Sequence, residues 1–402
     1  MSARRNRPLT LALLVVVLVL AACSGAPSGQ GGDSSSTPST SAAATVSSID
    51  KSKVMSPTES AAIDTTANDF LTTSPDKSPG LWLAVWDPAK GYYEQAYGDA
   101  VADTTKATVA DHSWIGSITK TVFATAVLQQ VAAGKLALTD TVQILDAELA
   151  AEYPAVGALT VAQLLGMTSG IPDFADAAVA AVAADHARSF TRDDDIALGL
   201  SLGTPKPAGT PGYSTTNIII MGVIMAKLTG KNPEELVNDA FTQAGMTQSN
   251  LPSSSSPLPP PSSHGYVGTV GAVQLQQLGV TEPATTDVTA WTQDYGKEAG
   301  GAYSIIGDLA TWGGACLGNS LLPTAMVDAR LQTHHIEDAG DYGLGIIGFN
   351  SPWYGHSGQV LGWESDVYCN TKTGAVFALM VNSTDGLFLS DVVRDAIFPG
   401  IK

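Results

Sequence analysis

Positive charge, cysteine and long apolar runs are all scarce in this sequence of 402 residues. Lysine and arginine together number 20, against 38 aspartate and glutamate residues, which gives a formal net charge of −18. A chain this acidic repels phosphate backbones, so we expect no nucleic-acid partner. Charged residues make up only 14% and hydrophobic residues 44%, a balance that excludes a coiled coil or a disordered scaffold and suits a globular enzyme.

Metal-binding patterns are lacking as well. The six histidines show no H-x-x-x-H or H-x-H spacing, and the three cysteines are Cys23, Cys316 and Cys369. We therefore expect neither a metal nor another cofactor. Cys316 and Cys369 are able to form one disulfide in an oxidising compartment, and two buried free thiols are the alternative.

The N-terminus carries an apolar run too short to span a bilayer. Arginines at positions 4, 5 and 7 precede the run at 9–20, and residues 20–23 read Leu-Ala-Ala-Cys. This order is typical of a cleaved export signal, and its ending resembles the bacterial lipobox, in which the cysteine is lipidated. We expect residues 1–22 to be a lipoprotein signal peptide and Cys23 to anchor a monomer to the outer face of the bacterial cytoplasmic membrane. A plain signal peptide with a coincidental cysteine is the alternative.

Residues 23–55 are rich in Ser, Gly, Thr, Ala and Pro, which predicts a flexible tether before a folded domain at 56–402. Within that domain, apolar periodicity and turn residues predict helices at 61–71, 117–133, 161–165 and 217–228, and strands at 80–86, 92–97, 343–349, 363–368 and 375–381. Residues 252–263 read as a Ser/Pro-rich loop. Strands thus come from both ends of the domain. This layout predicts a mixed α/β fold with a mainly helical region, about 135–290, inserted in the sheet domain.

One candidate nucleophile stands at the start of a predicted helix. Residues 117–120 read Ser-Ile-Thr-Lys, so the Ser117 hydroxyl and the Lys120 amine lie one helical turn apart. A serine becomes a nucleophile when a neighbouring base takes its proton, and a desolvated lysine is such a base. The same S-x-x-K spacing recurs at 48–51 and 74–77, but the first copy lies in the tether and the second contains a proline. Only the copy at 117 precedes a long apolar helix.

Two further motifs contain candidate site residues. Residues 212–217 read Gly-Tyr-Ser-Thr-Thr-Asn at the entry to a predicted helix, where Tyr213 is placed to relay a proton, although a structural tyrosine is the alternative. Residues 354–358 read Tyr-Gly-His-Ser-Gly, and a His beside small residues suits a strand edge that substrate approaches. A structural role is the alternative for His356.

Together and in this order, the three motifs resemble the serine penicillin-recognising family, which includes class C β-lactamases, D,D-peptidases and related esterases. The segments at 164–172 and 300–310 are similar to the family's "LLxHTSGLP" and "GGLxS…DLA" segments. The resemblance implies an antiparallel sheet flanked by helices, an acyl-enzyme on Ser117, and proton transfer shared by Lys120 and Tyr213. It also implies that His356 replaces the Lys of the family's K-T-G motif. Substrate binding would then involve Thr215, Ser357, Gly358 and Gln359, with the N–H groups of Ser117 and Gln359 forming an oxyanion hole.

A literal Lys-Thr-Gly also occurs at 372–374, between two predicted strands and directly after Asn370. A hairpin turn belongs at that place, so we exclude Lys372 from the site.

The sequence departs from the family pattern at Thr215, where the second motif usually has Asn, and at Met167, where the "HTSG" segment usually has His. Because a hydroxyl has less reach than an amide, Thr215 argues against efficient β-lactamase activity. We therefore expect a serine hydrolase that acts on a cell-envelope D-amino-acid peptide or a small ester. A β-lactamase, a catalytically weak module that binds penicillin or peptidoglycan peptides, and a solute-binding lipoprotein are the alternatives.

Overall fold

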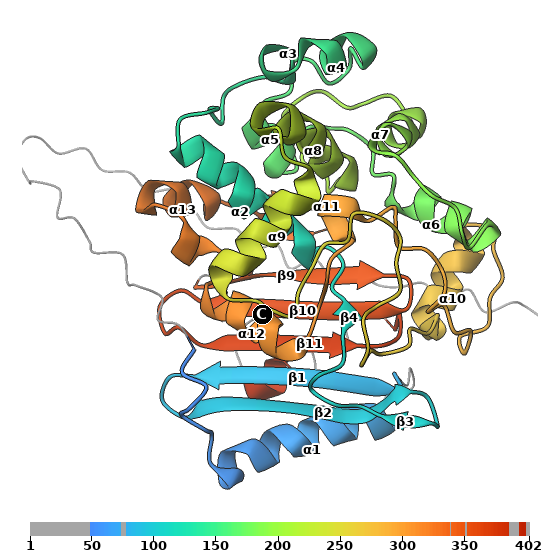
Figure 1. Ribbon diagram of the computed structural model, residues 1–402, viewed down its shortest axis with the longest axis vertical. Coiled ribbons are helices and arrows are strands. Elements are labelled where there is room, and N and C mark those ends of the chain that lie inside the picture. Colours follow the sequence, from blue (N-terminus) through green and yellow to red (C-terminus); the bar gives the residue numbers. More distant parts are fainter. Residues whose placement is uncertain (1–48, 74–77, 338, 350–351, 386–393, 399–402) are drawn as a thin grey trace, which may run out of the picture. The chain divides into compact units, whose positions relative to one another are not determined.

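The computed structural model describes residues 49–73, 78–337, 339–349, 352–385 and 394–398, all of which belong to the compact unit Ala43–Lys402. Within these residues, nine strands form one sheet in the order β3-β2-β1-β11-β10-β9-β8-β7-β6, and each neighbouring pair is antiparallel (Figure 1). The predicted signal peptide, Cys23 and most of the predicted tether lie outside the described residues.

Both ends of the domain contribute strands to this sheet. The first three are β1 (Gly80–Asp87), β2 (Gly91–Val101) and β3 (Thr105–Lys106). The later ones are β6 (His334–Ile336), β7 (Gly340–Tyr342), β8 (Ile347–Phe349), β9 (Trp353–Val360), β10 (Trp363–Asn370) and β11 (Val376–Val381). A separate pair joins β4 (Ser113–Trp114) to β5 (Tyr303–Ser304).

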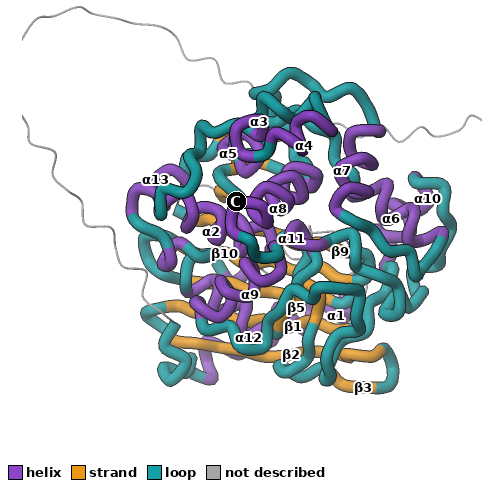
Figure 2. Tube along the Cα trace, turned by 45° about the horizontal axis from the view of Figure 1, so that its top comes forward, coloured by secondary structure: helices purple, strands orange, loops and turns teal. Residues whose placement is uncertain are grey.

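Most helices lie in sequence between β4 and β5. They are α2 (Ile118–Ala132), α3 (Val142–Leu145), α4 (Ala147–Glu152), α5 (Val161–Leu165), α6 (Ala175–Ala184), α7 (Arg192–Ser201), α8 (Thr215–Thr229), α9 (Pro233–Ala244), α10 (Gly268–Gln277) and α11 (Lys297–Gly300). Outside this stretch lie α1 (Pro57–Thr73), α12 (Ile306–Gly314), the 3-10 helix η1 (Asn319–Leu321) and α13 (Thr324–Arg330). Figure 2 shows α3, α4, α5, α7 and α8 gathered on one side of the strands.

Strand β1, which lies between β2 and β11, shows that the sheet has two apolar faces. Along its length Leu81, Leu83 and Val85 pack into a core that includes residues of α1, while Trp82 and Ala84 belong to the larger core on the opposite face. Alternate residues of a strand point to opposite faces, so an uninterrupted apolar run is what a strand covered on both sides requires. The mixed α/β fold predicted from the sequence is confirmed.

Helix boundaries follow local signals. The Thr160 side chain accepts the Gln163 N–H at the start of α5, and the Gln163 side chain completes a capping box. Gly230, with φ of 70°, ends α8 in the left-handed conformation that favours glycine. The strands predicted at 80–86 and 92–97 pair as a hairpin of β1 and β2, and Asp87 Oδ1 accepts the Ala89 N–H at 2.8 Å within its turn.

Two predicted boundaries are wrong. The end of the predicted tether is part of the folded structure, since the Met55 N–H donates to the Tyr92 carbonyl at 2.9 Å and the Met55 side chain is buried. This pairing with β2 places apolar surface against the domain, which composition alone does not reveal. The strand predicted at 343–349 begins only at Ile347. None of the described helices combines the length and apolar character that crossing a membrane requires.

Candidate active site

The start of α2 brings the predicted nucleophile and base together. Ser117 is the N-cap residue of α2, and Lys120 lies on the first turn with only 1% of its surface exposed. The Lys120 Nζ lies 2.9 Å from the Ser117 Oγ. This is the hydrogen bond that the one-turn spacing predicts, and it is short enough for proton transfer between the two groups.

Burial lowers the pKa of the Lys120 amine, which allows the amine to act as a base. Desolvation lowers the pKa of Lys120 to about 7, and the nearby Asp173 carboxylate opposes that effect. Because Lys120 Nζ also donates to the Ala299 carbonyl at 2.8 Å, the amine is held from two sides. A large fraction of the amine is therefore neutral at pH 7 and has a lone pair available for the serine proton.

Tyr213 lies beside this pair, in the loop that enters α8. Its ring centroid is 5.0 Å from the Lys120 Nζ, and its hydroxyl is close enough to Ser117 for that side chain to oppose the rise in its pKa. Burial raises the pKa of Tyr213 far above the neutral range, so the phenol keeps its proton. A protonated hydroxyl beside the serine and lysine pair is placed to donate to a leaving group.

Strand β9 places His356 behind Tyr213, in contact with Tyr342. The His356 Nε2 lies 2.9 Å from the Tyr342 hydroxyl, its Nδ1 faces the Ser357 carbonyl, and its ring lies 6.3 Å from that of Tyr213. Burial lowers the pKa of His356 to about 3, so the imidazole is neutral. His356 is therefore placed to orient neighbouring aromatic side chains without carrying charge.

The Ser357 side chain does not join this group. Its hydroxyl lies 2.9 Å from the Tyr368 hydroxyl, and Tyr368 belongs to the core on the α1 side of the sheet. Successive side chains of β9 alternate between faces, so Ser357 points away from the face that holds His356. Only the backbone of Ser357 is left to contact a ligand on the Ser117 side.

The backbones before Ser117 and at the end of β9 touch. A Cβ at Gly358 would lie 2.0 Å from the Ile115 carbonyl, and one at Gly116, whose φ is 50°, would lie 2.5 Å from the Gln359 nitrogen. The two glycines therefore permit an approach that any side chain would block. This contact brings the segments that carry the Ser117 and Gln359 N–H groups together, as the predicted oxyanion hole requires.

Two residues of this site were missed from the sequence. Asp173 accepts a hydrogen bond from the Thr215 hydroxyl at 3.3 Å and interacts electrostatically with Lys120. Burial raises the pKa of its carboxyl group, and Lys120 opposes the rise. Asp173 directly follows the "LLxHTSGLP"-like segment, so its position next to a recognised motif could have marked it as a candidate. Tyr342, the partner of His356, lies on β7, and no motif in the sequence marked it as a candidate.

A small hollow of about 100 Å³ opens beside Gln359. Apolar side chains from α6, α10 and the end of β9 form much of its lining, together with the Asp176 carboxylate. Gln359 is the one residue of the predicted site that lines it.

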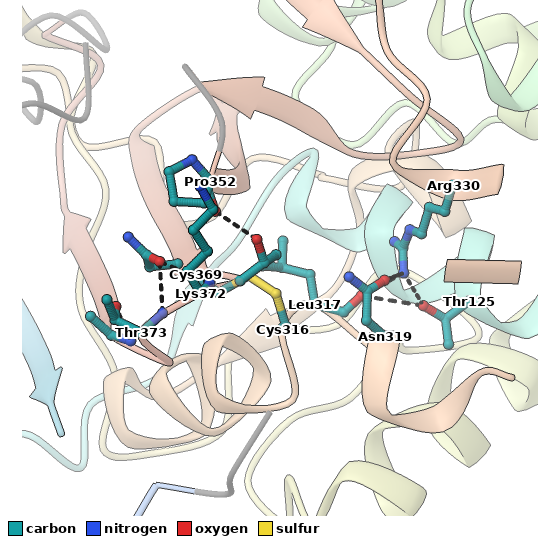
Figure 3. The surroundings of a disulfide bond; sticks show 12 residues. Thr125, Cys316, Leu317, Asn319, Arg330, Pro352, Cys369, Lys372 and Thr373 are labelled. Carbon is teal, nitrogen blue, oxygen red and sulfur yellow. Dashed lines mark hydrogen bonds between the residues drawn. A yellow bond between two sulfur atoms is a disulfide. The ribbon is translucent and has the colours of Figure 1, made fainter. Parts of the chain in front are cut away.

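The Lys372-Thr373-Gly374 segment lies away from these groups. It forms the turn between β10 and β11, where the Asn370 side chain accepts the N–H groups of Lys372 and Thr373 at 3.0 and 2.9 Å (Figure 3). The exclusion of Lys372 on turn chemistry agrees with this geometry.

Next to that turn, Cys369 is bonded to Cys316, with 5.3 Å between their Cα atoms. Of the two alternatives left open by the sequence, the structure contains the disulfide. Within the described part of the chain, no three His, Cys, Asp or Glu side chains gather in a way that suits a metal ion.

A serine whose hydroxyl lies against a buried amine is equipped for covalent catalysis through the serine oxygen, as in acyl transfer. The protein is accordingly a serine hydrolase. The family model described as Beta-lactamase matches residues 67–399, and the chain belongs to this family.

Solved structures of similar fold include amidases and a penicillin-binding protein. A D-stereospecific amidohydrolase from Streptomyces sp. is 25% identical, with a TM-score of 0.68 over 85% of this chain and 98% of that one. The D-amino acid amidase from Ochrobactrum anthropi SV3 is 21% identical, with a TM-score of 0.74 and the same coverage. A penicillin binding protein from Bacillus halodurans is 22% identical, with a TM-score of 0.65 over 84% and 99% of the two chains.

Proposed function

We propose that this protein hydrolyses the amide bond of small D-amino-acid amides or short D-amino-acid peptides through an acyl-enzyme on Ser117. The observation that carries the proposal is the 2.9 Å contact between the Ser117 hydroxyl and the buried Lys120 amine. The D-configured substrate class is supported by the amidohydrolase and the amidase of similar fold.

The reaction assigns a step to each residue. Lys120 takes the hydroxyl proton as the Ser117 oxygen bonds to the amide carbon, and the N–H groups of Ser117 and Gln359 stabilise the oxyanion. Tyr213 passes a proton to the amine as the C–N bond breaks, and Lys120 returns its proton to Tyr213. Water then attacks the ester carbon and loses a proton to Lys120. As the bond from that carbon to the Ser117 oxygen breaks, Lys120 gives the proton to the serine oxygen and the acid product leaves.

In its ionised form, Asp173 would favour an amine over a carboxylate next to the reacting carbonyl. Its carboxylate is close enough to interact electrostatically with both Lys120 and Tyr213, and Thr215 holds it with a hydrogen bond. A substrate ammonium group would be attracted there, whereas the terminal carboxylate of a carboxypeptidase substrate would be repelled. We therefore place amino-acid amides and peptide N-termini ahead of a carboxypeptidase substrate and of a simple ester.

A substrate panel with matched variants tests this function. We expect wild type to release p-nitroaniline from D-alanine p-nitroanilide, and to act more slowly on the N-acetylated compound and on the L-isomer. Ser117→Ala should lose both turnover and labelling by a fluorophosphonate. Faster turnover of nitrocefin or of an acyl-D-Ala-D-Ala peptide than of the amide would overturn the substrate assignment. No labelling at any pH would overturn the acyl-enzyme.

A weak binding module is the second candidate, favoured by the engagement of Thr215 with Asp173. The family's usual Asn at this position offers an amide donor and acceptor to substrate, whereas the Thr215 hydroxyl already donates to Asp173. Saturable binding of a D-amino-acid peptide by wild type, without hydrolysis of any member of the panel, would favour the module.

We further propose that a lipid on Cys23 holds the enzyme at the outer face of the cytoplasmic membrane. The lipobox-like residues 20–23 support this location. Cys23→Ser should move the full-length protein from the membrane fraction into the soluble fraction, without changing its activity per active site. An unchanged membrane fraction would count against the anchor.

A further inference from the structure

A single helical turn, α11, lies directly behind the nucleophile. It packs against α2, α8, α9 and β9, and its Ala299 carbonyl accepts a hydrogen bond from the Lys120 Nζ at 2.8 Å. A neutral amine has two N–H bonds and one lone pair. When one N–H points at the Ala299 carbonyl, the directions open to the lone pair are restricted, and the Ser117 hydroxyl lies 2.9 Å away. The position of α11 therefore bears on how well Lys120 accepts the serine proton.

Helix α11 does not hold itself in place. It has four residues, and its first residue, Lys297, has φ of 40°, a conformation that L side chains rarely adopt. A turn this short and strained persists only when its surroundings fix it. The Lys297 amine contributes by donating to the Phe190 carbonyl at 2.6 Å and the Asp294 carbonyl at 3.0 Å.

The stronger anchor is the residue next to Ala299. The Glu298 carboxylate is fully buried and accepts from Arg192 of α7 through two nitrogens, with the shortest contact at 2.7 Å. The same guanidinium donates to Glu234 of α9 at 2.8 Å. Of these two carboxylates, only Glu298 belongs to α11. The bidentate bond therefore fixes both the distance and the angle between α11 and α7.

Gly222 of α8 makes room for this anchor. A Cβ at Gly222 would lie 1.6 Å from the Glu298 Oε1 and 2.6 Å from its Cδ. The carboxylate thus passes across the surface of α8 at a point where any side chain would displace it. Three helices, α7, α8 and α9, converge on the group adjacent to the Ala299 carbonyl.

We propose that the Arg192–Glu298 ion pair is a positioning device for the catalytic base: it sets the place of the Ala299 carbonyl, and through it the orientation of the Lys120 amine. The proposal rests on the function proposed for Lys120. Neither Arg192 nor Glu298 contacts the reacting atoms in this assignment. Their effect on the rate passes through the backbone of α11.

Glu298→Gln tests the proposal, because an amide keeps the shape of the side chain but turns one of the two acceptors into a donor that faces Arg192. We expect kcat for D-alanine p-nitroanilide to fall about 10- to 100-fold per active site, with KM changed less than about threefold. The midpoint of the acid limb of kcat/KM should move to lower pH, because the Lys120 ammonium loses part of its carbonyl acceptor. Titration with a fluorophosphonate supplies the number of active sites, so misfolded protein does not enter the rate.

Glu234→Gln is the matched control. It removes the same charge from the same arginine, but on α9 instead of α11. If Glu234→Gln lowers kcat and shifts the pH midpoint as much as Glu298→Gln does, the effect is one of net charge, and the positioning role is overturned. We expect Glu234→Gln to stay within about twofold of wild type in kcat.

Gly222→Ala is an independent probe that leaves every charge in place. Its methyl group should push the Glu298 carboxylate aside and reproduce the loss of kcat. Wild-type rates and midpoints in both Glu298→Gln and Gly222→Ala would overturn the proposal while leaving the proposed function intact. A wild-type enzyme with no turnover at all would instead remove the function on which it rests.

Discussion

At the scale of single residues, Lys120 sets the pH at which the enzyme works. Burial lowers the pKa of Lys120 to about 7, and a base must be neutral to accept a proton, so kcat/KM should rise with pH through about 7 and then level off. Lys120→Arg should abolish acylation, because a guanidinium stays protonated. A pH series from 5 to 9 with D-alanine p-nitroanilide provides the measurement.

His356→Gln is the control for this assignment. Burial holds the pKa of His356 near 3, so its ring stays neutral throughout that range. The variant should be slower, since Tyr342 and Tyr213 lose a ring neighbour, but its midpoint should remain at the wild-type value. A midpoint that moves with this substitution would assign the acid limb to the histidine instead.

Asp195 is a buried carboxyl group whose oxygens have no hydrogen-bond partner among the described residues. Burial raises its pKa from the ordinary 3.8 to about 8. Between these two values the folded state keeps a proton that the unfolded state has lost, so the free energy of unfolding contributed by this group falls as pH rises. Asp195→Asn should therefore raise the free energy of unfolding by about 1–3 kcal/mol at pH 8 and change it little at pH 4.

Urea unfolding at the two pH values measures this difference, and Asp193→Asn on the exposed side of the same helix is the control. An equal gain for Asp195→Asn at pH 4 and pH 8 would show that the carboxyl group is not protonated in the folded state.

At the scale of elements, the contact between β9 and the segment before α2 limits substitution. Gly358→Ala should push the strand away from Ile115, whose carbonyl would lie 2.0 Å from the new Cβ. Separation of the Ser117 and Gln359 N–H groups should lower the acylation rate per active site about 100-fold, as loss of an oxyanion donor does. Stopped-flow measurement of fluorophosphonate labelling gives this rate.

Gly355→Ala is a matched control on the same strand. Its Cβ would lie 2.2 Å from the Tyr368 ring, on the opposite face of the sheet. This variant should lose stability but keep an acylation rate near that of wild type. Equal losses of rate in both variants would mean that general strain in β9, and not the N–H geometry, is responsible.

Which elements the sequence could predict depends on how local their causes are. The first turn of α2 and the turn at Asn370 each follow from a few neighbouring residues, and both were predicted. Helix α11 is too short to show any periodicity and starts with a strained Lys297, so only the packing around it explains its existence.

The residues of the candidate site also fall into two groups, those that local motifs predict and those that only long-range contacts place. Ser117, Lys120 and Tyr213 stand in recognisable motifs, and the structure brings them into contact. The placement of Asp173 depends on how the loop after α5 folds toward Lys120, and that of Tyr342 on the pairing of β7 with β8. Long-range contacts of this kind leave no periodic trace in the sequence.

At the scale of the whole molecule, the sheet joins the two ends of the domain. Strand β1 pairs with β11, so folding must bring together residues that are far apart in the sequence, such as Leu81 and Val381, which are 300 positions apart. Such non-local pairing costs loop-closure entropy before it gains contacts. The disulfide between Cys316 and Cys369 shortens this path, since it joins the segment after α12 to β10 across a sequence separation of 53 residues.

Removal of that disulfide should therefore affect stability far more than activity. Cross-linking a loop of this length stabilises a domain by about 4 kcal/mol through the unfolded state, so Cys316→Ser with Cys369→Ser should lower the thermal midpoint by roughly 5–10 °C. Neither cysteine contacts Ser117 or Lys120 in the described hydrogen-bond network, so kcat at 25 °C should stay within about twofold of wild type. A reducing agent should destabilise wild type by a similar amount and leave the double variant unchanged, as scanning calorimetry with and without reductant would measure. If the double variant loses activity at 25 °C while it remains folded, the bridge instead shapes the site, most directly through Leu317, whose carbonyl accepts from Arg330 at 2.7 Å.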